Sequence, residues 1–234
     1  ASIPFDLFPN EAHHGTIDIR GGEHAMRILV IGANGQIGRM VVEKLKESEH
    51  DPVAMVRKEA QAEALHQKGI KTVIGDLEQD FSHAFEDIDL VLFTAGSGAK
   101  TGADKTILID QEGAMESIDL AKEHGVKHFV MVSGMGVEKA READDAMRPY
   151  MHAKFRADEH LEASGVPYTI LRPGRLTNYD GKGSVDFHEY EGETRYGEVP
   201  RADVASVLVE IINAKPENKL YYLISGDTPV AEIL

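Results

Sequence analysis

The chain has 234 residues, 42% of them hydrophobic, and a formal net charge of −15. This length suits one doubly wound α/β domain and is short for two. The acidic excess disfavours a nucleic acid or a membrane as partner, since either would normally need a basic face. The absence of cysteine excludes disulfides, thiolate metal sites and cysteine nucleophiles, and it is compatible with a reducing cytoplasm.

Residues 1–25 contain two prolines and show no persistent period, so we expect an extension, native or added during cloning, before a domain over 26–234. They lack the cationic start and apolar core of a secretory signal. His13 and His14 have no third ligand near in sequence, and no metal site is predicted. No apolar run approaches the ~20 residues that span a bilayer, and we expect a cytoplasmic protein.

A strand, a glycine-rich turn and a helix are predicted from Arg27 onward, where the sequence reads RILVIGANGQIGR. The four apolar residues Ile28 to Ile31 suit a parallel strand buried on both faces. Three glycines follow, and their spacing lets the backbone turn sharply, approach a pyrophosphate and pack the helix on the strand. The helix start presents unpaired N–H groups to that pyrophosphate. We therefore expect cofactor contacts from Gly32, Asn34, Gly35, Gln36, Ile37 and Gly38, although a tight structural turn would also explain the glycines.

The second strand, Pro52 to Val56, ends at Arg57, about 20 residues after the glycine motif. An acidic residue at this place would bind the ribose 2′-hydroxyl of NAD. A guanidinium instead suits a 2′-phosphate, so the sequence predicts NADP rather than NAD. Arg39 is a second candidate partner for that phosphate, or an ordinary surface arginine.

Two further strands end in residues suited to the adenosine side of a cofactor. Strand three lies in KTVIGDL, and Asp76 and Leu77 follow at its carboxyl end, where open α/β sheets bind ligands. Asp76 is expected to accept a hydrogen bond from the adenine amino group, or simply to cap a helix. Strand four, Asp89 to Phe93, leads to the small residues Ala95, Gly96 and Ser97, which would let a cofactor lie against the backbone or form a flexible loop.

A helix over Ala103 to His124 and a fifth strand over Lys127 to Val132 come next, with Ser133 at the strand end. His124 and His128 are expected to be exposed. After an acidic linker, Tyr150 and Lys154 lie four residues apart and share one face of a helix. A lysine ammonium stabilises a nearby phenolate, which makes a tyrosine a usable proton donor and acceptor.

The carboxyl-terminal third contains a sixth strand, Val166 to Leu171, followed by Arg172, Pro173 and Gly174. An irregular polar segment from Asn178 to Gly197, within a small substrate-side region near 175–200, is the candidate substrate loop. A helix over Arg201 to Ile212 and a final strand over Lys219 to Ile224 complete the predicted elements.

These motifs together resemble the short-chain dehydrogenase/reductase superfamily, and more closely its atypical single-domain NAD(P)H-binding branch, which includes epimerase/dehydratase-like proteins. The resemblance rests on GANGQIG, Arg57, GDL, TAGSG, Ser133, YMHAK, LRPG and RADVA and covers Met26 to about Ile224. It implies a parallel sheet of about seven strands in the order 3-2-1-4-5-6-7, with helices on both faces.

The resemblance also implies roles for individual residues. Tyr150 would protonate a carbonyl as hydride arrives from the nicotinamide, Lys154 would bind the nicotinamide ribose and tune the tyrosine, and Ser133 would orient the substrate oxygen. Arg172, Pro173 and Gly174 would lie by the nicotinamide.

This chain departs from the superfamily pattern in three places. Gly134 replaces the usual second serine, Asp110 stands where a catalytic tetrad commonly has asparagine, and only about 60 residues follow Gly174. The short carboxyl-terminal part argues against a nucleotide-sugar substrate. Asp110 alters the expected proton relay.

The leading hypothesis is an NADPH-dependent oxidoreductase acting on a small carbonyl or conjugated substrate, as a monomer or homodimer. Some small relatives reduce flavins or tetrapyrroles, where solvent supplies the proton. The alternative from another class is a regulatory protein that senses NADP without turnover.

Overall fold

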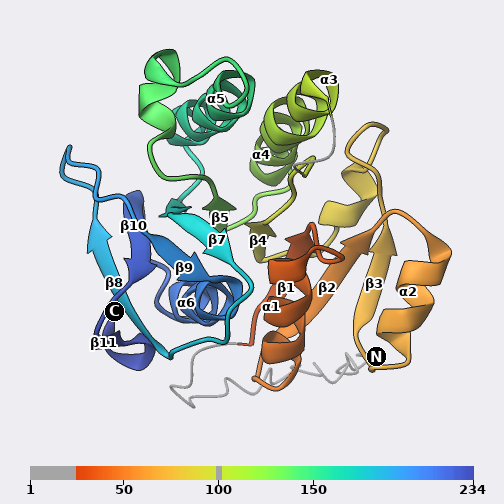
Figure 1. The fold of residues 1–234 in the computed structure, drawn as a ribbon. Coiled ribbons are helices and arrows are strands. Elements are labelled where there is room, and N and C mark those ends of the chain that lie inside the picture. The colour runs from red at the N-terminus through yellow and green to blue at the C-terminus, as the bar shows by residue number, and fades with distance from the viewer. Residues whose placement is uncertain (1–24, 99–101) are drawn as a thin grey trace, which may run out of the picture.

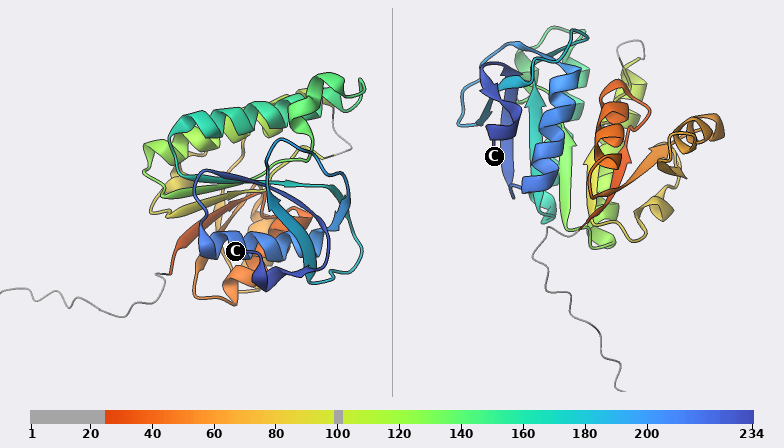
Figure 2. Two further views of the ribbon diagram at one scale, coloured as in Figure 1. Left: turned by 90° about the vertical axis from the view of Figure 1, so that its left-hand side faces the viewer. Right: turned by 90° about the horizontal axis from the view of Figure 1, so that it is seen from below.

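The computed structural model describes residues 25–98 and 102–234, so the expected extension 1–25, with His13 and His14, lies outside the described residues except for residue 25. Within the described part, nine strands form one twisted sheet with helices on both faces (Figure 1, Figure 2). Seven neighbouring strands are parallel. In spatial order they are β3 (Lys71–Ile74), β2 (Asp51–Val56), β1 (Arg27–Ile31), β4 (Leu90–Phe93), β5 (His128–Val132), β6 (Tyr168–Pro173) and β10 (Lys219–Ser225). The predicted doubly wound fold and its strand order are confirmed, with β10 as the seventh strand.

Two antiparallel strands extend this sheet beyond β10, and neither was predicted. They are β8 (Ser184–Glu189) and β11 (Thr228–Pro229), so the expectations of an irregular segment over 178–197 and of a last strand at 219–224 were wrong. Only Val185 and Phe187 of β8 are apolar, a pattern too short to indicate a strand without its partner. Two more short strands, β7 (Arg175–Thr177) and β9 (Glu198–Pro200), pair with each other apart from the main sheet.

The helices form two layers. One layer covers the lower face of the sheet in Figure 1 and consists of α1 (Gln36–Lys46), α2 (Glu59–His66) and α6 (Arg201–Ala214). The other contains the expected helix after β4, which runs as α3 (Ala103–Lys105), the π-helix η2 (Thr106–Gly113) and α4 (Ala114–Glu123), together with α5 (Arg148–Ser164). Short 3₁₀ helices are η1 (Ser82–Phe85), η3 (Val137–Glu142) and η4 (Val230–Glu232). No helix in these described ranges is long and apolar enough to cross a membrane.

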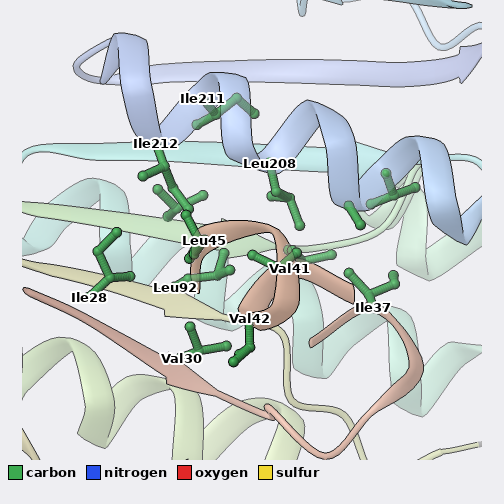
Figure 3. Close-up of a cluster of buried hydrophobic side chains, with 14 of the residues drawn as sticks. Ile28, Val30, Ile37, Val41, Val42, Leu45, Leu92, Leu208, Ile211 and Ile212 are labelled. Carbon is green, nitrogen blue, oxygen red and sulfur yellow. The ribbon is translucent and has the colours of Figure 1, made fainter. Parts of the chain in front are cut away.

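Strand β1 lies between the two helix layers, which explains why its sequence is an unbroken apolar run. Ile28 and Val30 pack with α1 and α6 (Figure 3), whereas Leu29 and Ile31 belong to the core on the opposite face. All four side chains are at most 1% exposed. A strand covered on both faces gains from apolar residues at every position, which fixes β1 in the middle of the sheet.

His128 is buried, so the expectation that it is exposed was wrong. It begins β5, is only 2% exposed, and its Nε2 lies 2.8 Å from the Thr169 hydroxyl on β6. Burial, with a smaller contribution from Lys215, lowers the pKa of His128 to about 4. The imidazole is therefore neutral at neutral pH.

Candidate functional site

The turn after β1 lies against the end of β4, and two glycines make this approach possible. Gly32 has φ +86°, and a Cβ there would lie 2.5 Å from the Ala95 nitrogen. A Cβ at Gly38 would lie 2.3 Å from the Gly32 oxygen, so α1 can pack this closely only without a side chain. The two loops meet where the strand order reverses, the place where doubly wound sheets bind ligands.

The start of α1 is open for an anion. Gly35 precedes the helix, no side chain caps it, and its first turn has no acidic residue. The first N–H groups of a helix need acceptors, and a diphosphate supplies them. Asn34 and Gln36 are exposed at this start, and Asn34 Oδ1 accepts a 2.6 Å hydrogen bond from Arg39. Ile37 faces inward instead and packs in the core. These residues fit the diphosphate of a dinucleotide.

A cleft of about 410 Å³ opens beside this helix start, between α1 and the beginning of α6. Gln36 and Arg39 line one wall. Thr177, Tyr179 and Arg201 line the other. Residues from the region near 175–200 therefore lie across this cleft from the first turns of α1.

Arg57 and Asp76 stand at the ends of the next two strands. Arg57 directly follows β2 and is exposed, and among the described residues its guanidinium makes no hydrogen bond or ion pair. Asp76 Oδ1 accepts the Glu78 N–H at 3.1 Å, so this carboxylate stabilises a turn. The next helix, η1, begins only at Ser82, so the alternative of a helix cap was wrong. Leu77 packs against Gly113 of η2, where an added Cβ would lie 3.0 Å from it. The Arg57 guanidinium therefore has no protein partner among the described residues and is available to a phosphate.

The small residues after β4 are fixed by Asp110. The Ser97 N–H donates to Asp110 Oδ2 at 2.9 Å, and a Cβ at Gly96 would lie 3.2 Å from Asp110 Oδ1. Asp110 is fully buried and forms an ion pair with Lys154, at 3.4 Å from Nζ. The structure thus brings two predicted groups, the cofactor loop and the catalytic residues, together through one carboxylate.

Tyr150 and Lys154 share the face of α5 that is turned to the sheet, as their spacing predicts. Lys154 is 5% exposed, and its Nζ lies 3.4 Å from the Ala95 oxygen and 3.3 Å from the Val132 oxygen. Burial alone would lower the pKa of Lys154, but Tyr150, Asp110 and Asp158 together raise it above its usual value. The Tyr150 hydroxyl lies 3.8 Å from the place of a Cβ at Gly134, next to Ser133. Ser133, Tyr150 and Lys154 therefore lie in one region, and the fourth catalytic candidate, Asp110, pairs with Lys154 there.

Arg172 occupies a different position from its neighbours Pro173 and Gly174. Its side chain is buried and forms ion pairs with Asp158, at 2.9 Å, and with Glu138, at 3.0 Å. Since two carboxylates already hold the guanidinium, the predicted contact of this loop with a cofactor is left to its backbone. A Cβ at Gly174 would lie 2.4 Å from the Gly197 oxygen, which packs the loop against β9.

Sequence reasoning missed Asp158 and Glu138. Asp158 is 1% exposed and accepts a hydrogen bond from the Ser133 hydroxyl at 2.8 Å. It lies four residues after Lys154, so the periodicity that joined Tyr150 to Lys154 also indicated this third position. Glu138 stood in a segment interpreted only as an acidic linker. Among the described residues, no group of three or more His, Asp or Glu is arranged to hold a metal ion.

The open helix start, the meeting loops and the sheet order define a dinucleotide-binding protein of the Rossmann type. The sequence model of the NAD(P)H-binding family matches residues 32–215, and the chain belongs to this family. It is 41% identical over 214 residues to Bacillus subtilis YhfK, which is named as an uncharacterized sugar epimerase, covering 89% of this chain and 99% of YhfK.

Two solved structures are similar over nearly the whole fold. An NAD-dependent epimerase/dehydratase-like protein from Bacillus halodurans has a TM-score of 0.85 and 44% identity, covering 89% of this chain and 98% of that one. ChuY from Escherichia coli O157:H7, described as an anaerobilin reductase, has a TM-score of 0.71 and 26% identity, covering 86% and 98%. Relatives in this family include oxidoreductases that use a nicotinamide cofactor.

Proposed function

We propose that this protein is an NADP(H)-dependent oxidoreductase of the short-chain dehydrogenase/reductase type that reduces a small carbonyl or conjugated substrate. The observation that carries the proposal is the Tyr150 hydroxyl at the end of β5, with the buried ammonium of Lys154 on the same helical face. When bound, the cofactor supplies the hydride.

The chain's own residues then have distinct tasks. Tyr150 donates a proton to the substrate oxygen, and Lys154 stabilises the phenolate that remains. Asp110 and the carbonyl oxygens of Ala95 and Val132 hold the Lys154 ammonium in place. Ser133 contacts the substrate beside the phenol.

The unpaired guanidinium of Arg57 supports NADP over NAD. It follows the strand that ends beside the adenosine ribose in this fold, and a 2′-phosphate would give it the partner that it lacks among the described residues.

A second candidate is reduction of a flavin or tetrapyrrole, and the similarity to ChuY favours it. A planar substrate of this kind would stack on the nicotinamide and take its proton from solvent. Tyr150 would then be dispensable, which separates this candidate from the first.

The test is NADPH oxidation by the purified protein against a panel of carbonyl compounds, quinones, flavins and tetrapyrroles. Tyr150→Phe removes the proton donor and is expected to lower kcat for a carbonyl substrate by about 100-fold or more. Tyr168→Phe is the matched control, because Tyr168 is half-buried at the start of β6, at the opposite edge of the sheet.

Three outcomes decide between the candidates. Carbonyl reduction that Tyr150→Phe leaves unchanged would show that the phenol is not the acid. Reduction of a flavin or tetrapyrrole at the same rate by the wild type and by Tyr150→Phe would favour the second candidate. Tight NADP binding with no oxidation by any compound would favour a sensor of the cofactor.

A further inference from the structure

The Ser133 hydroxyl donates a hydrogen bond to the buried carboxylate of Asp158. Ser133 Oγ lies 2.8 Å from Asp158 Oδ2, and the two residues are 4% and 1% exposed. An ionised carboxylate only accepts hydrogen bonds, so the serine must be the donor. A hydroxyl has a single proton, and this bond uses it.

The carboxylate is held so that it cannot turn away from the serine. Arg172 donates to the same Asp158 oxygen from Nε at 3.0 Å and lies 2.9 Å from it with Nη2. Arg172 is itself fixed by Glu138, whose other oxygen accepts from the hydroxyls of Tyr222, at 2.8 Å, and Thr194, at 2.9 Å. Rotation of Asp158 would separate a buried ion pair, which is costly.

We propose that Asp158 is a positioning residue that turns the Ser133 proton inward, so that Ser133 meets the substrate as a hydrogen-bond acceptor and not as a donor. The inference rests on the proposed function, because that function takes Ser133 as a group that contacts the substrate. Of the two hydroxyls, Tyr150 alone then donates to a substrate oxygen.

The consequence is a requirement on the substrate. The atom next to Ser133 must carry an O–H or N–H, because an acceptor facing only lone pairs would lose its hydrogen bond on entering the site. The substrate class is therefore a hydroxylated carbonyl compound or a conjugated ring system with an N–H beside the reduced position.

The surrounding charges keep this arrangement in place near neutral pH. Burial raises the pKa of Asp158 to about 6, while Arg172, Ser133 and Lys154 oppose the rise. The pKa of Arg172 and of Lys154 is raised and that of Glu138 is lowered, so these neighbours stay charged. Asp110 faces the site from η2 through Lys154. Above pH 6 the ionised carboxylate accepts the hydrogen bond from the serine hydroxyl, and below pH 6 its own protonation weakens that bond.

The experiment is a pH titration of aspartate γ-carbons by ¹³C NMR on substrate-free protein, with the Asp158 signal assigned through Asp158→Asn. Ser133→Ala removes a donor to the charged form, so the midpoint of Asp158 is expected to rise by about one pH unit. Ser133→Thr keeps the hydroxyl and is expected to restore the wild-type midpoint. Ser117→Ala is the matched control, because this buried serine donates to the Gly113 oxygen at 2.6 Å.

A midpoint that Ser133→Ala leaves unchanged or lowers would overturn the proposal, as would a rise that Ser133→Thr fails to reverse. The titration needs neither substrate nor turnover. Its failure is therefore distinguishable from a failure of the reductase panel.

Discussion

At the scale of single residues, Arg57 and Arg172 show why an arginine's neighbours decide what it can bind. Arg172 is held between two carboxylates in the interior. Arg57 is exposed at a strand end and makes no side-chain hydrogen bond or ion pair within the described ranges. Of the two, Arg57 is the one whose charge is available to a ligand phosphate.

Arg57→Ala is expected to weaken NADP binding by about 10- to 100-fold, because one charge-assisted contact to the 2′-phosphate is lost. NAD has no such phosphate, so its affinity should stay the same. Isothermal titration calorimetry with both nucleotides measures the difference, with Arg156→Ala as an exposed arginine control on α5. An equal loss for both nucleotides would contradict the 2′-phosphate assignment.

At the scale of elements, the π-helix η2 determines where Asp110 lies. Ordinary α-helical spacing predicted a continuous helix here, but residues Thr106–Gly113 form wider turns. Ile107 and Leu108 remain 48% and 41% exposed, while Asp110 is fully buried against Lys154. Single π-helical segments are rare and often accompany functional sites, and this one places a carboxylate behind the proposed catalytic lysine.

Asp110→Ala is expected to lower the free energy of unfolding by about 3 to 5 kcal/mol, because it leaves the Lys154 ammonium buried without its charged partner. Urea denaturation at neutral pH measures the change. Asp119→Ala is the control, since Asp119 on the neighbouring α4 forms an exposed pair with His160 and should matter far less. Similar losses of unfolding free energy for the two variants would show that the buried ion pair stabilises the fold no more than the exposed pair does.

At the scale of the whole molecule, two buried groups give opposite dependences of stability on pH. The pKa of His128 is about 4 in the folded protein and 6.5 in the unfolded chain. The unfolded chain therefore binds this proton first, and the free energy of unfolding falls as the pH drops from 6.5 to about 4. Asp158 takes a proton at about 6 in the folded state and at 3.8 when unfolded, so its contribution changes in the opposite direction.

His128→Gln removes the first contribution and keeps the second. Between pH 7 and 4.5 the wild type is expected to lose about 2 to 3 kcal/mol of unfolding free energy relative to the variant. Urea denaturation at both pH values gives this difference, and His124→Gln provides an exposed histidine as control. Parallel pH profiles of wild type and His128→Gln would contradict the burial argument.

The sequence by itself determined the features that depend on neighbours along the chain. The apolar run Ile28 to Ile31, the glycines after it and the spacing of Tyr150 and Lys154 are local patterns, and each has a physical period or turn requirement. They sufficed for the fold class, whereas the strand order and the roles of Ser133, Tyr150 and Lys154 were expected from the resemblance to the short-chain dehydrogenase/reductase superfamily.

Only the tertiary structure decided the features that depend on distant partners. The burial of His128 required β6 beside β5, and β8 required β10 as its hydrogen-bonding neighbour. The hydrogen bond from Ser133 to Asp158 joins residues that are 25 positions apart. A polar side chain has no sequence period that names its partner, because the partner is chosen by which elements pack together, and that is settled when the sheet and its helices assemble.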